Sequence, residues 1–354
     1  MYRSVLRLLL FFGLLAPVLT RGLAAPADLA DWQRQPSHTS LPLYDIHFLD
    51  AARGLAVGDA GLLLATADGG ITWSALPIGV ASDLRALYFG DANQGWIAGA
   101  AGLLLATTDG GASWQAAATL FPGDLHALSF VDAAHGWAGG DQGSLYRFDG
   151  QNWMHSALPG GFDIRALAFV DAQRGWAAGS GGAILRTDDG GHTWRTQTLG
   201  AASIFHDLYF RDALQGWAVG SGGVIFHTED GGAVWQLLAS GVSADLHAIA
   251  FADVQRGWIV GAGGTALYSD DGGHTWTPDT PGYGFDLHAV AFPDPSQAWS
   301  AGDAGLIMRW RNPAPPTATA TATPTATPTA TATPTPTPTP TLTHTPTATP
   351  TESP

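Results

Sequence analysis

The sequence predicts an all-β protein, a seven-bladed β-propeller of four-stranded antiparallel blades closed by an N-terminal strand that completes the last blade. Three observations predict this fold. A repeat runs through most of the 354 residues, each repeat holds four short apolar runs between turn residues, and the last repeat lacks a strand that the N-terminal segment has in excess.

The repeat is most visible in the tryptophans. A Gly-Trp series is spaced by 41, 39, 41, 41 and 41 residues, and Leu55 fills its slot one period earlier: Trp96, Trp137, Trp176, Trp217, Trp258 and Trp299. A second series is spaced by 41, 41, 39, 41, 41 and 41 residues: Trp32, Trp73, Trp114, Trp153, Trp194, Trp235 and Trp276. Together the two series indicate seven units.

Each unit contains four expected strands. In one unit they are residues 163–169, 176–178, 183–187 and 193–197. Four strands in one such repeat make a propeller blade, since a single small sheet cannot bury both faces and must stack on similar neighbours around an axis.

The chain ends predict how the ring closes. In the last unit, the position expected for the second-series tryptophan is Thr317, in a low-complexity segment, so a fourth strand is missing there. Trp32 begins a fourth strand with no blade before it. We therefore expect Trp32 to about Gln35 to pair with the sheet of residues 286–310, which leaves no free sheet edge.

A turn motif, T-x-D-G-G-x-T-W, follows the third strand of most units. This Asp box contains one repeated aspartate in each of the first six units: Asp68, Asp109, Asp149, Asp189, Asp230 and Asp271. The carboxylate can accept N–H groups of its own turn and the glycines permit positive φ, so we interpret the motif as structural; metal binding is the alternative. Residues 148–153 are two residues shorter, and their turn should differ.

The flanking segments predict export. Residues 1–25 have a charged start, an apolar stretch and a small-residue cleavage site, as in a signal peptide; an uncleaved anchor is the alternative. Residues 26–312 form the propeller. Residues 313–354 consist almost entirely of Thr, Pro and Ala and are expected to be a disordered tail. The expected location is extracellular, at the cell surface or periplasmic.

Composition excludes several functions. The chain has a net charge of -15, with fifteen Lys and Arg residues that are all Arg, which disfavours nucleic acid and anionic membranes as partners. It has no cysteine, which excludes disulfides and thiolate sites. We expect a monomer that does not insert into a membrane after signal removal.

The candidate binding face is a set of polar residues at the start of each first strand, near the central channel: Tyr44, Arg85, His126, Arg165, His206, His247 and His288. An aspartate often lies two residues earlier: Asp83, Asp124, Asp163, Asp245 and Asp286. These residues either pair to hold blades together or form a basic ring for an anionic ligand, whose affinity would change near the ordinary histidine pKa of about 6.5. We expect no metal, because positions one blade apart are usually too far apart to share an ion.

Aromatic residues that break the repeat are the second part of this face. They lie in or beside the loops that enter first strands: Phe121, Phe162, Phe205, Tyr283 and Phe285. Exposed rings there would suit contact with a peptide, a glycan or a pigment. Packing over the core is the equal alternative.

The residues favour a binding protein over an enzyme. A sialidase-like glycoside hydrolase, the main alternative together with a lectin, needs a carboxylate pair or a Tyr nucleophile with an acidic partner. The propeller has one glutamate, Glu229, in a turn, and one unusual aspartate, Asp207. We predict no catalytic residues and no cofactor.

The D-G-G-x-T-W turns, with G-W-x-x-G in the second strand, resemble the BNR-type (Asp-box) propellers of the photosystem II assembly and stability factors of cyanobacteria and chloroplasts. The resemblance covers residues 32–310 and implies an exported, non-catalytic protein that binds another protein during assembly. The lack of lysine and the Thr/Pro-rich tail favour a role outside photosynthesis.

Overall fold

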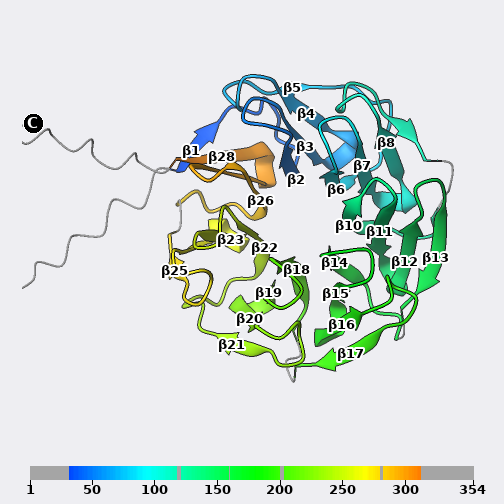
Figure 1. Cartoon of the computed structure of the whole chain (residues 1–354). Helices are drawn as coiled ribbons and strands as arrows, with labels where there is room; N and C mark the ends of the chain where they lie inside the picture. Colours follow the sequence, from blue (N-terminus) through cyan, green and yellow to red (C-terminus); the bar gives the residue numbers. More distant parts are fainter. Residues whose placement is uncertain (1–31, 118–120, 159, 200–202, 280–281, 312–354) are drawn as a thin grey trace, which may run out of the picture. The chain divides into compact units, whose positions relative to one another are not determined.

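The computed structural model describes residues 32–117, 121–158, 160–199, 203–279 and 282–311, which form seven four-stranded antiparallel sheets around a central channel (Figure 1). The predicted seven-bladed propeller is therefore confirmed. The predicted signal peptide and Thr/Pro-rich tail lie outside the described residues. Within the described part of the chain, no helix is both long and apolar enough to cross a membrane.

The blades follow one another along the chain. Blade 1 comprises β2 (Leu43–Phe48), β3 (Gly54–Gly58), β4 (Leu63–Thr66) and β5 (Ser74–Ala75). Blade 2 comprises β6 (Leu84–Phe89), β7 (Gly95–Gly99), β8 (Leu104–Thr107) and β9 (Gln115–Ala116). Blade 3 comprises β10 (Leu125–Asp132), β11 (His135–Gly140), β12 (Ser144–Phe148) and β13 (Trp153–Ala157). Blade 4 comprises β14 (Ile164–Phe169), β15 (Gly175–Gly179), β16 (Ala183–Thr187) and β17 (Arg195–Thr198).

The remaining blades include the closing sheet. Blade 5 comprises β18 (Phe205–Phe210), β19 (Gly216–Gly220), β20 (Val224–Thr228) and β21 (Gln236–Leu238). Blade 6 comprises β22 (Leu246–Phe251), β23 (Gly257–Gly261), β24 (Ala266–Ser269) and β25 (Thr277–Pro278). Blade 7 comprises β26 (Leu287–Asp294), β27 (Gln297–Gly302), β28 (Leu306–Arg311) and β1 (Trp32–Gln35).

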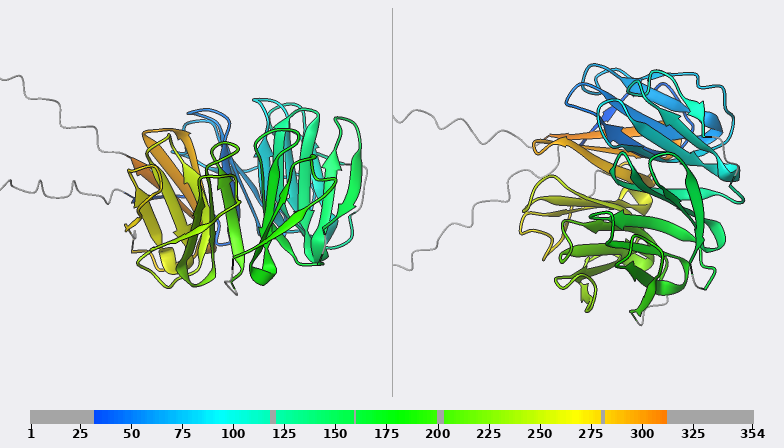
Figure 2. Two further views of the ribbon diagram at one scale, coloured as in Figure 1. Left: turned by 60° about the horizontal axis from the view of Figure 1, so that its bottom comes forward. Right: turned by 45° about the vertical axis from the view of Figure 1, so that its right-hand side comes forward.

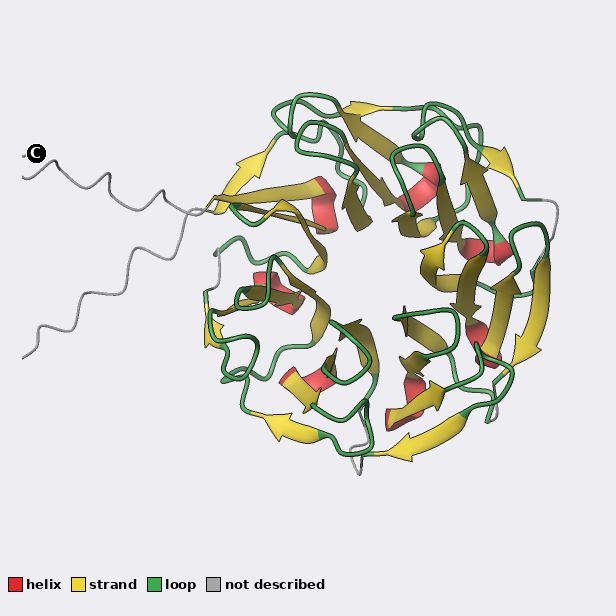
Figure 3. Cartoon of the chain, in the orientation of Figure 1, coloured by secondary structure: helices red, strands yellow, loops and turns green. Residues whose placement is uncertain are grey.

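A short 3-10 turn joins the second and third strands of each blade (Figure 3). The seven turns are η1 (Asp59–Gly61), η2 (Ala100–Gly102), η3 (Asp141–Gly143), η4 (Ser180–Gly182), η5 (Ser221–Gly223), η6 (Ala262–Gly264) and η7 (Asp303–Gly305). These turns lie at the same end of each blade as the start of the first strand. The first strands surround the channel, and Figure 2 shows the blades from two further directions.

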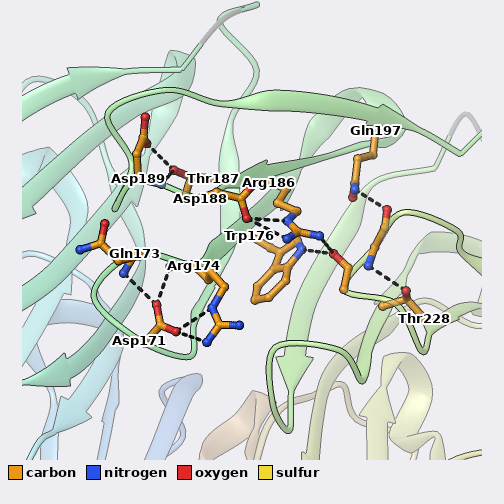
Figure 4. Close-up of polar contacts among 12 residues, drawn as sticks. Asp171, Gln173, Arg174, Trp176, Arg186, Thr187, Asp188, Asp189, Gln197 and Thr228 are labelled. Atoms are coloured by element: carbon orange, nitrogen blue, oxygen red, sulfur yellow. Dashed lines mark hydrogen bonds and ion pairs between the residues drawn. The ribbon is translucent and has the colours of Figure 1, made fainter.

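Neighbouring blades are joined through the Gly-Trp tryptophans. Trp137, Trp176 and Trp217 are fully or almost fully buried. Each donates its indole N–H to a glycine carbonyl in the Asp box of the next blade, with nitrogen–oxygen distances of 3.0, 3.1 and 3.0 Å. In Figure 4, Arg186 donates to the same Gly231 carbonyl as Trp176. Each buried tryptophan therefore fixes the next turn.

Blade 7 closes the ring by combining β1, the first strand of the propeller, with β26, β27 and β28, the last three. Strand β1 pairs with β28 in antiparallel register, Trp32 opposite Trp310 and Gln35 opposite Ile307. Trp32 also packs edge-to-face on Trp258 of blade 6, with ring centroids 5.2 Å apart. The predicted pairing is thus confirmed, because β1 satisfies the sheet edge that β28 would otherwise expose.

The Asp-box carboxylates accept hydrogen bonds from their own turns. Asp271 accepts the hydroxyls of Ser269 and Thr275 at 2.8 and 2.6 Å, and the Thr275 N–H at 3.0 Å. Burial acts to raise the pKa of Asp271, but these hydrogen bonds outweigh it and hold the pKa at about 2. With both oxygens engaged, the carboxylate is a structural group of the hairpin.

The shortened turn of blade 3 differs as expected. Asp149 accepts the backbone N–H groups of Gln151 and Asn152 at 2.9 and 2.7 Å, within a tighter loop. Beside this turn, a hollow of about 370 Å³ lies between blades 2 and 3, lined in part by Trp96, Phe148 and Trp153. The missing residues thus leave space between two blades, away from the channel.

Trp32→Ala should destabilise the whole ring. Trp32 is 7% exposed and lies between blades 6 and 7, so removal of its ring should lower the free energy of unfolding by about 3–5 kcal/mol. Urea unfolding followed by tryptophan fluorescence measures this, with the exposed neighbour Gln33→Ala as control. Equal stability of the two variants would contradict the role of β1 in closure.

Asp271→Asn should reduce the acid sensitivity of the fold. A folded pKa of about 2 lies below the unfolded value of about 3.9, so the stabilisation from Asp271 is complete above pH 4 and is lost as the pH falls towards 2. Melting temperatures from pH 7 to pH 2 should therefore fall less steeply for this variant than for wild type. The exposed neighbour Asp270→Asn is the control, and identical slopes for Asp271→Asn and wild type would refute the assignment.

Candidate binding site at the channel mouth

The seven predicted ring residues come together at one end of the channel. They line a hollow of about 360 Å³, together with Asp286: Tyr44, Arg85, His126, Arg165, His206, His247 and His288. A second hollow of about 250 Å³ has the same seven side chains in its lining and also includes Asp45 and Asp207. We call the seven side chains the mouth ring.

A β-bulge places each mouth-ring residue. In every blade the pairing of the first and second strands shifts by one residue at this position, as between Leu43 and Asp45 or between Phe205 and Asp207. The skipped residue is the mouth-ring residue in all seven sheets. A bulge leaves the extra residue out of the ladder and redirects its side chain, so the backbone itself forms the ring.

Several mouth-ring side chains bond to the 3-10 turn of their own blade. His126 and His288 contact Asp141 and Asp303 through Nε2 at 2.8 and 2.9 Å. His206 contacts the Ser221 hydroxyl at 3.0 Å. Each partner lies fifteen residues after the ring residue, a spacing that recurs because the turn follows the second strand.

The aspartates that lie two residues before the mouth-ring residues bond to backbone N–H groups of the preceding blade. Each accepts an N–H from the 3-10 turn of the preceding blade, at distances of 2.7 to 3.1 Å: Asp83 from Ala60, Asp124 from Ala101, Asp163 from Gln142, Asp245 from Gly222 and Asp286 from Gly263. The predicted Asp-to-His or Asp-to-Arg pairing is thus incomplete. These aspartates join blades through backbone groups.

The two ring arginines differ in their partners. Arg85 forms an ion pair of 2.9 Å with Asp124 of the next blade. Arg165 is exposed, and among the described residues no carboxylate lies within 4.0 Å of its guanidinium. Arg165 therefore presents positive charge at the mouth that an anionic group can use.

Two ring histidines are held neutral at pH 7. Burial lowers the pKa of His206 to about 4, helped by the charges of His247 and Arg165. Burial also lowers the pKa of His247. A charge change near pH 6.5 was expected for the ring histidines, and for these two it is shifted to lower pH because the mouth is too confined to hydrate an imidazolium well.

One arc of the ring is continuous. Ring centroids lie 5.3 Å apart for His206 and His247, 5.3 Å for His247 and His288, and 5.5 Å for His288 and Tyr44. One ligand atom from each of His206, Asp245 and His247 lies within 4.8 Å of the other two. The expectation that blade spacing keeps such groups apart is therefore wrong for this pair of blades.

Two aspartates lie deeper in the channel. Asp45 accepts the N–H groups of Ile46 and Leu87, both at 2.8 Å, and so joins blade 1 to blade 2. Asp207 makes the same contacts with Leu208 and Ile249. Although these N–H groups favour the ionised form, burial dominates and raises the pKa of each carboxyl to about 7.

The sequence pointed to Asp207 but missed Asp45. The equivalent residue is alanine in the other five blades: Ala86, Ala127, Ala166, Ala248 and Ala289. The signal was therefore present as a second departure from the repeat.

The five aromatic candidates separate into two groups. Phe121 and Phe205 are 3% and 0% exposed and belong to the core, because each packs against an aromatic ring of the same blade, Tyr146 or Phe226. Phe162 is half-buried in the cluster between blades 3 and 4. Tyr283 and Phe285 are 39% and 43% exposed beside β26. Only these last two present substantial aromatic surface near the mouth.

Comparison with known proteins identifies the family. The family model described as "Photosynthesis system II assembly factor YCF48" matches residues 24–153, 148–242 and 239–311. The chain belongs to this family. A search of curated proteins finds no match.

Solved structures share the fold. YCF48 bound to D1 peptide is 24% identical, with a TM-score of 0.69 over 82% of this chain and 97% of that chain. YCF48 from Cyanidioschyzon merolae is 21% identical, with a TM-score of 0.67 over 79% and 98%. A catalytically inactive virginiamycin B lyase from Staphylococcus aureus is 15% identical, with a TM-score of 0.68 over 78% and 98%. The match to the family model makes the chain an assembly-factor-like propeller, and these structures share its fold.

Replacing both channel aspartates should change the pH dependence of stability. Their folded pKa of about 7 exceeds the unfolded value of about 3.9, so the folded protein binds more protons between these values and loses stability as the pH rises from 4 to 7. The Asp45→Ala/Asp207→Ala variant should lose this downward slope. Urea midpoints from pH 4 to 8 measure it, and curves parallel to wild type would contradict the raised pKa.

Proposed function

We propose that the protein is an exported, non-catalytic binding propeller that holds a negatively charged segment of a partner protein at the mouth ring. The observation that carries this proposal is the convergence of all seven bulged side chains on one hollow, whose lining includes Arg165, a residue with no carboxylate partner among the described residues. An anionic side chain or carboxylate terminus of the partner would supply the pairing that Arg165 lacks.

The net negative charge of the protein does not prevent the mouth ring from binding a negatively charged segment. The chain carries -15 overall, but screening at physiological salt limits each charge to a range of about 8 Å. Within the mouth, Arg85 is paired with Asp124, whereas Arg165 has no carboxylate within 4.0 Å among the described residues. Tyr283 and Phe285 would add apolar contact beside the charged group.

Family membership supports a protein as the partner. The similar structure named YCF48 bound to D1 peptide is a propeller of this family with a peptide ligand. We expect a different partner for this chain, because the lack of lysine and the Thr/Pro-rich C-terminal segment favour a role outside photosynthesis. The N-terminal charged and apolar stretch supports export to the cell surface, the periplasm or the medium.

The channel carboxyls argue for binding rather than hydrolysis. A glycoside hydrolase needs one carboxyl to donate a proton and another to attack or to activate water. In both Asp45 and Asp207, one oxygen accepts the N–H of the next residue in its own strand, and the other accepts an N–H from the first strand of the next blade. Because both oxygens are engaged, neither can face a substrate without losing one of these hydrogen bonds.

Affinity capture with the full-length protein tests the proposal. We expect wild type to retain a stoichiometric protein partner from the cell envelope of its source, and Arg85→Gln/Arg165→Gln to bind it at least tenfold more weakly. A hydrogen bond to a charged group contributes about 1.5–3 kcal/mol, and a tenfold change is about 1.4 kcal/mol.

The matched control is Arg53→Gln/Arg174→Gln, which removes the same charge from turns at the opposite ends of two first strands. This control should bind as wild type does. Equal binding by the ring variant, or no protein partner, would overturn the proposal. A bound glycan lost from the ring variant would instead support the lectin or hydrolase alternative.

A further inference from the structure

We propose that the mouth holds a zinc site between blades 5 and 6, with His206, Asp245 and His247 as the ligands. Two imidazoles and a carboxylate form a ligand set typical of Zn²⁺ sites that keep an open position. The inference is independent of peptide binding and would stand if the proposed partner were wrong.

The three side chains are close enough to share an ion. One ligand atom from each lies within 4.8 Å of the others, and the two imidazoles meet edge-to-face at 5.3 Å. Ligand atoms around a tetrahedral zinc ion lie about 3.4 Å apart, given bonds of about 2.1 Å. Small side-chain rotations close this difference, and all three residues are half-buried on fixed strand starts.

Each ligand residue already has an outer partner. His247 bonds to the Leu287 carbonyl through Nδ1 at 3.0 Å; a carbonyl only accepts, so Nδ1 carries the proton and Nε2 keeps its lone pair. The Ser221 hydroxyl engages Nε2 of His206 at 3.0 Å, which leaves Nδ1. One oxygen of Asp245 accepts the Gly222 N–H at 2.7 Å, and the other oxygen is available to bind the ion. Such outer contacts orient the ligands of metal sites.

The repeat provides an internal comparison. At the junction of blades 2 and 3, the residue equivalent to His206 is Arg85, and the aspartate equivalent to Asp245 is Asp124. There the guanidinium pairs with the carboxylate at 2.9 Å, so the cation is part of the chain. In blades 5 and 6 the imidazole of His206 replaces the guanidinium. The equivalent carboxylate, Asp245, therefore faces a neutral group that can bind a cation.

The surrounding charges permit a divalent ion. Arg165 lies near enough to oppose one, whereas the carboxylates of Asp245 and Asp286 favour it. The nearby carboxylates therefore offset the arginine.

A second grouping, His227, Glu229 and His274, lies away from the mouth. His227 stacks on Trp217 at 4.7 Å with an interplanar angle of 18°, much as Arg186 and Arg309 cover the equivalent tryptophans. The repeat thus explains His227 as a packing residue. His274→Gln removes this grouping in the experiment below.

Zinc titration of the untagged full-length protein tests the proposal. Calorimetry with ZnCl₂ alone should give one equivalent bound by wild type at pH 7, and His206→Arg should bind it at least about a hundredfold more weakly. This substitution recreates the Arg85–Asp124 arrangement, so the ring should still fold, which circular dichroism and melting temperature check. Ser221→Ala should lower the affinity by about tenfold or more.

Two further variants locate the ion. His126→Gln, a ring histidine two blades away, and His274→Gln should both keep the equivalent. Absence of zinc binding by wild type would overturn the proposal, as would wild-type affinity in folded His206→Arg. Equal losses in His126→Gln and His206→Arg would also overturn it, because the ion would then be shared around the mouth.

Discussion

The pairing of β1 with β28 is the constraint on which the rest of the structure depends. The same kinds of contact between neighbouring blades recur around the ring, as when Trp176 bonds to the Asp box of the next blade. Such a series has to close, because an open last blade would expose both a sheet edge and an apolar face. Trp32 covers that face and β1 satisfies that edge, so distant parts of the sequence become one blade.

Closure also creates the candidate site. No single blade could make a pocket from one bulged residue, and the hollow exists because seven equivalent bulges face the same axis. The repeat sets the position of each mouth-ring residue, and the residues that depart from the repeat set the chemical properties of the mouth. His206 where blade 2 has Arg85, and Asp45 where five blades have alanine, are departures of this kind.

Much of this was predictable from sequence because propeller geometry is encoded locally and repeatedly. Tryptophan spacing gave the blade number, the mismatch between chain ends gave the closure, and alignment of the first strands gave every mouth-ring position. The Asp-box hydrogen bonds follow from short-range geometry, since the partners of Asp271 lie within four residues of it.

The errors concern features that depend on neighbouring blades. The aspartate of one blade bonds to the turn of the preceding blade, so Asp245 and Gly222 are 23 residues apart and no local pattern links them. Burial of Phe121 and Phe205 was one of two open alternatives, and it depends on packing within their own blades against Tyr146 and Phe226. The lowered pKa of His206 depends on its burial in the mouth. The short distance between His206 and His247 likewise arises from curvature of the ring, which periodicity does not specify.

The most direct test of the account uses the absence of cysteine from the chain. Gln33 lies opposite Arg309 in the closing sheet, and opposite residues of antiparallel strands are close enough for a disulfide. Gln33→Cys/Arg309→Cys should therefore oxidise to an intramolecular disulfide in the folded protein and raise the urea midpoint. The two-residue mismatch Gln33→Cys/Arg311→Cys should form it poorly. Equal crosslinking of both pairs, or of neither, would contradict closure by β1.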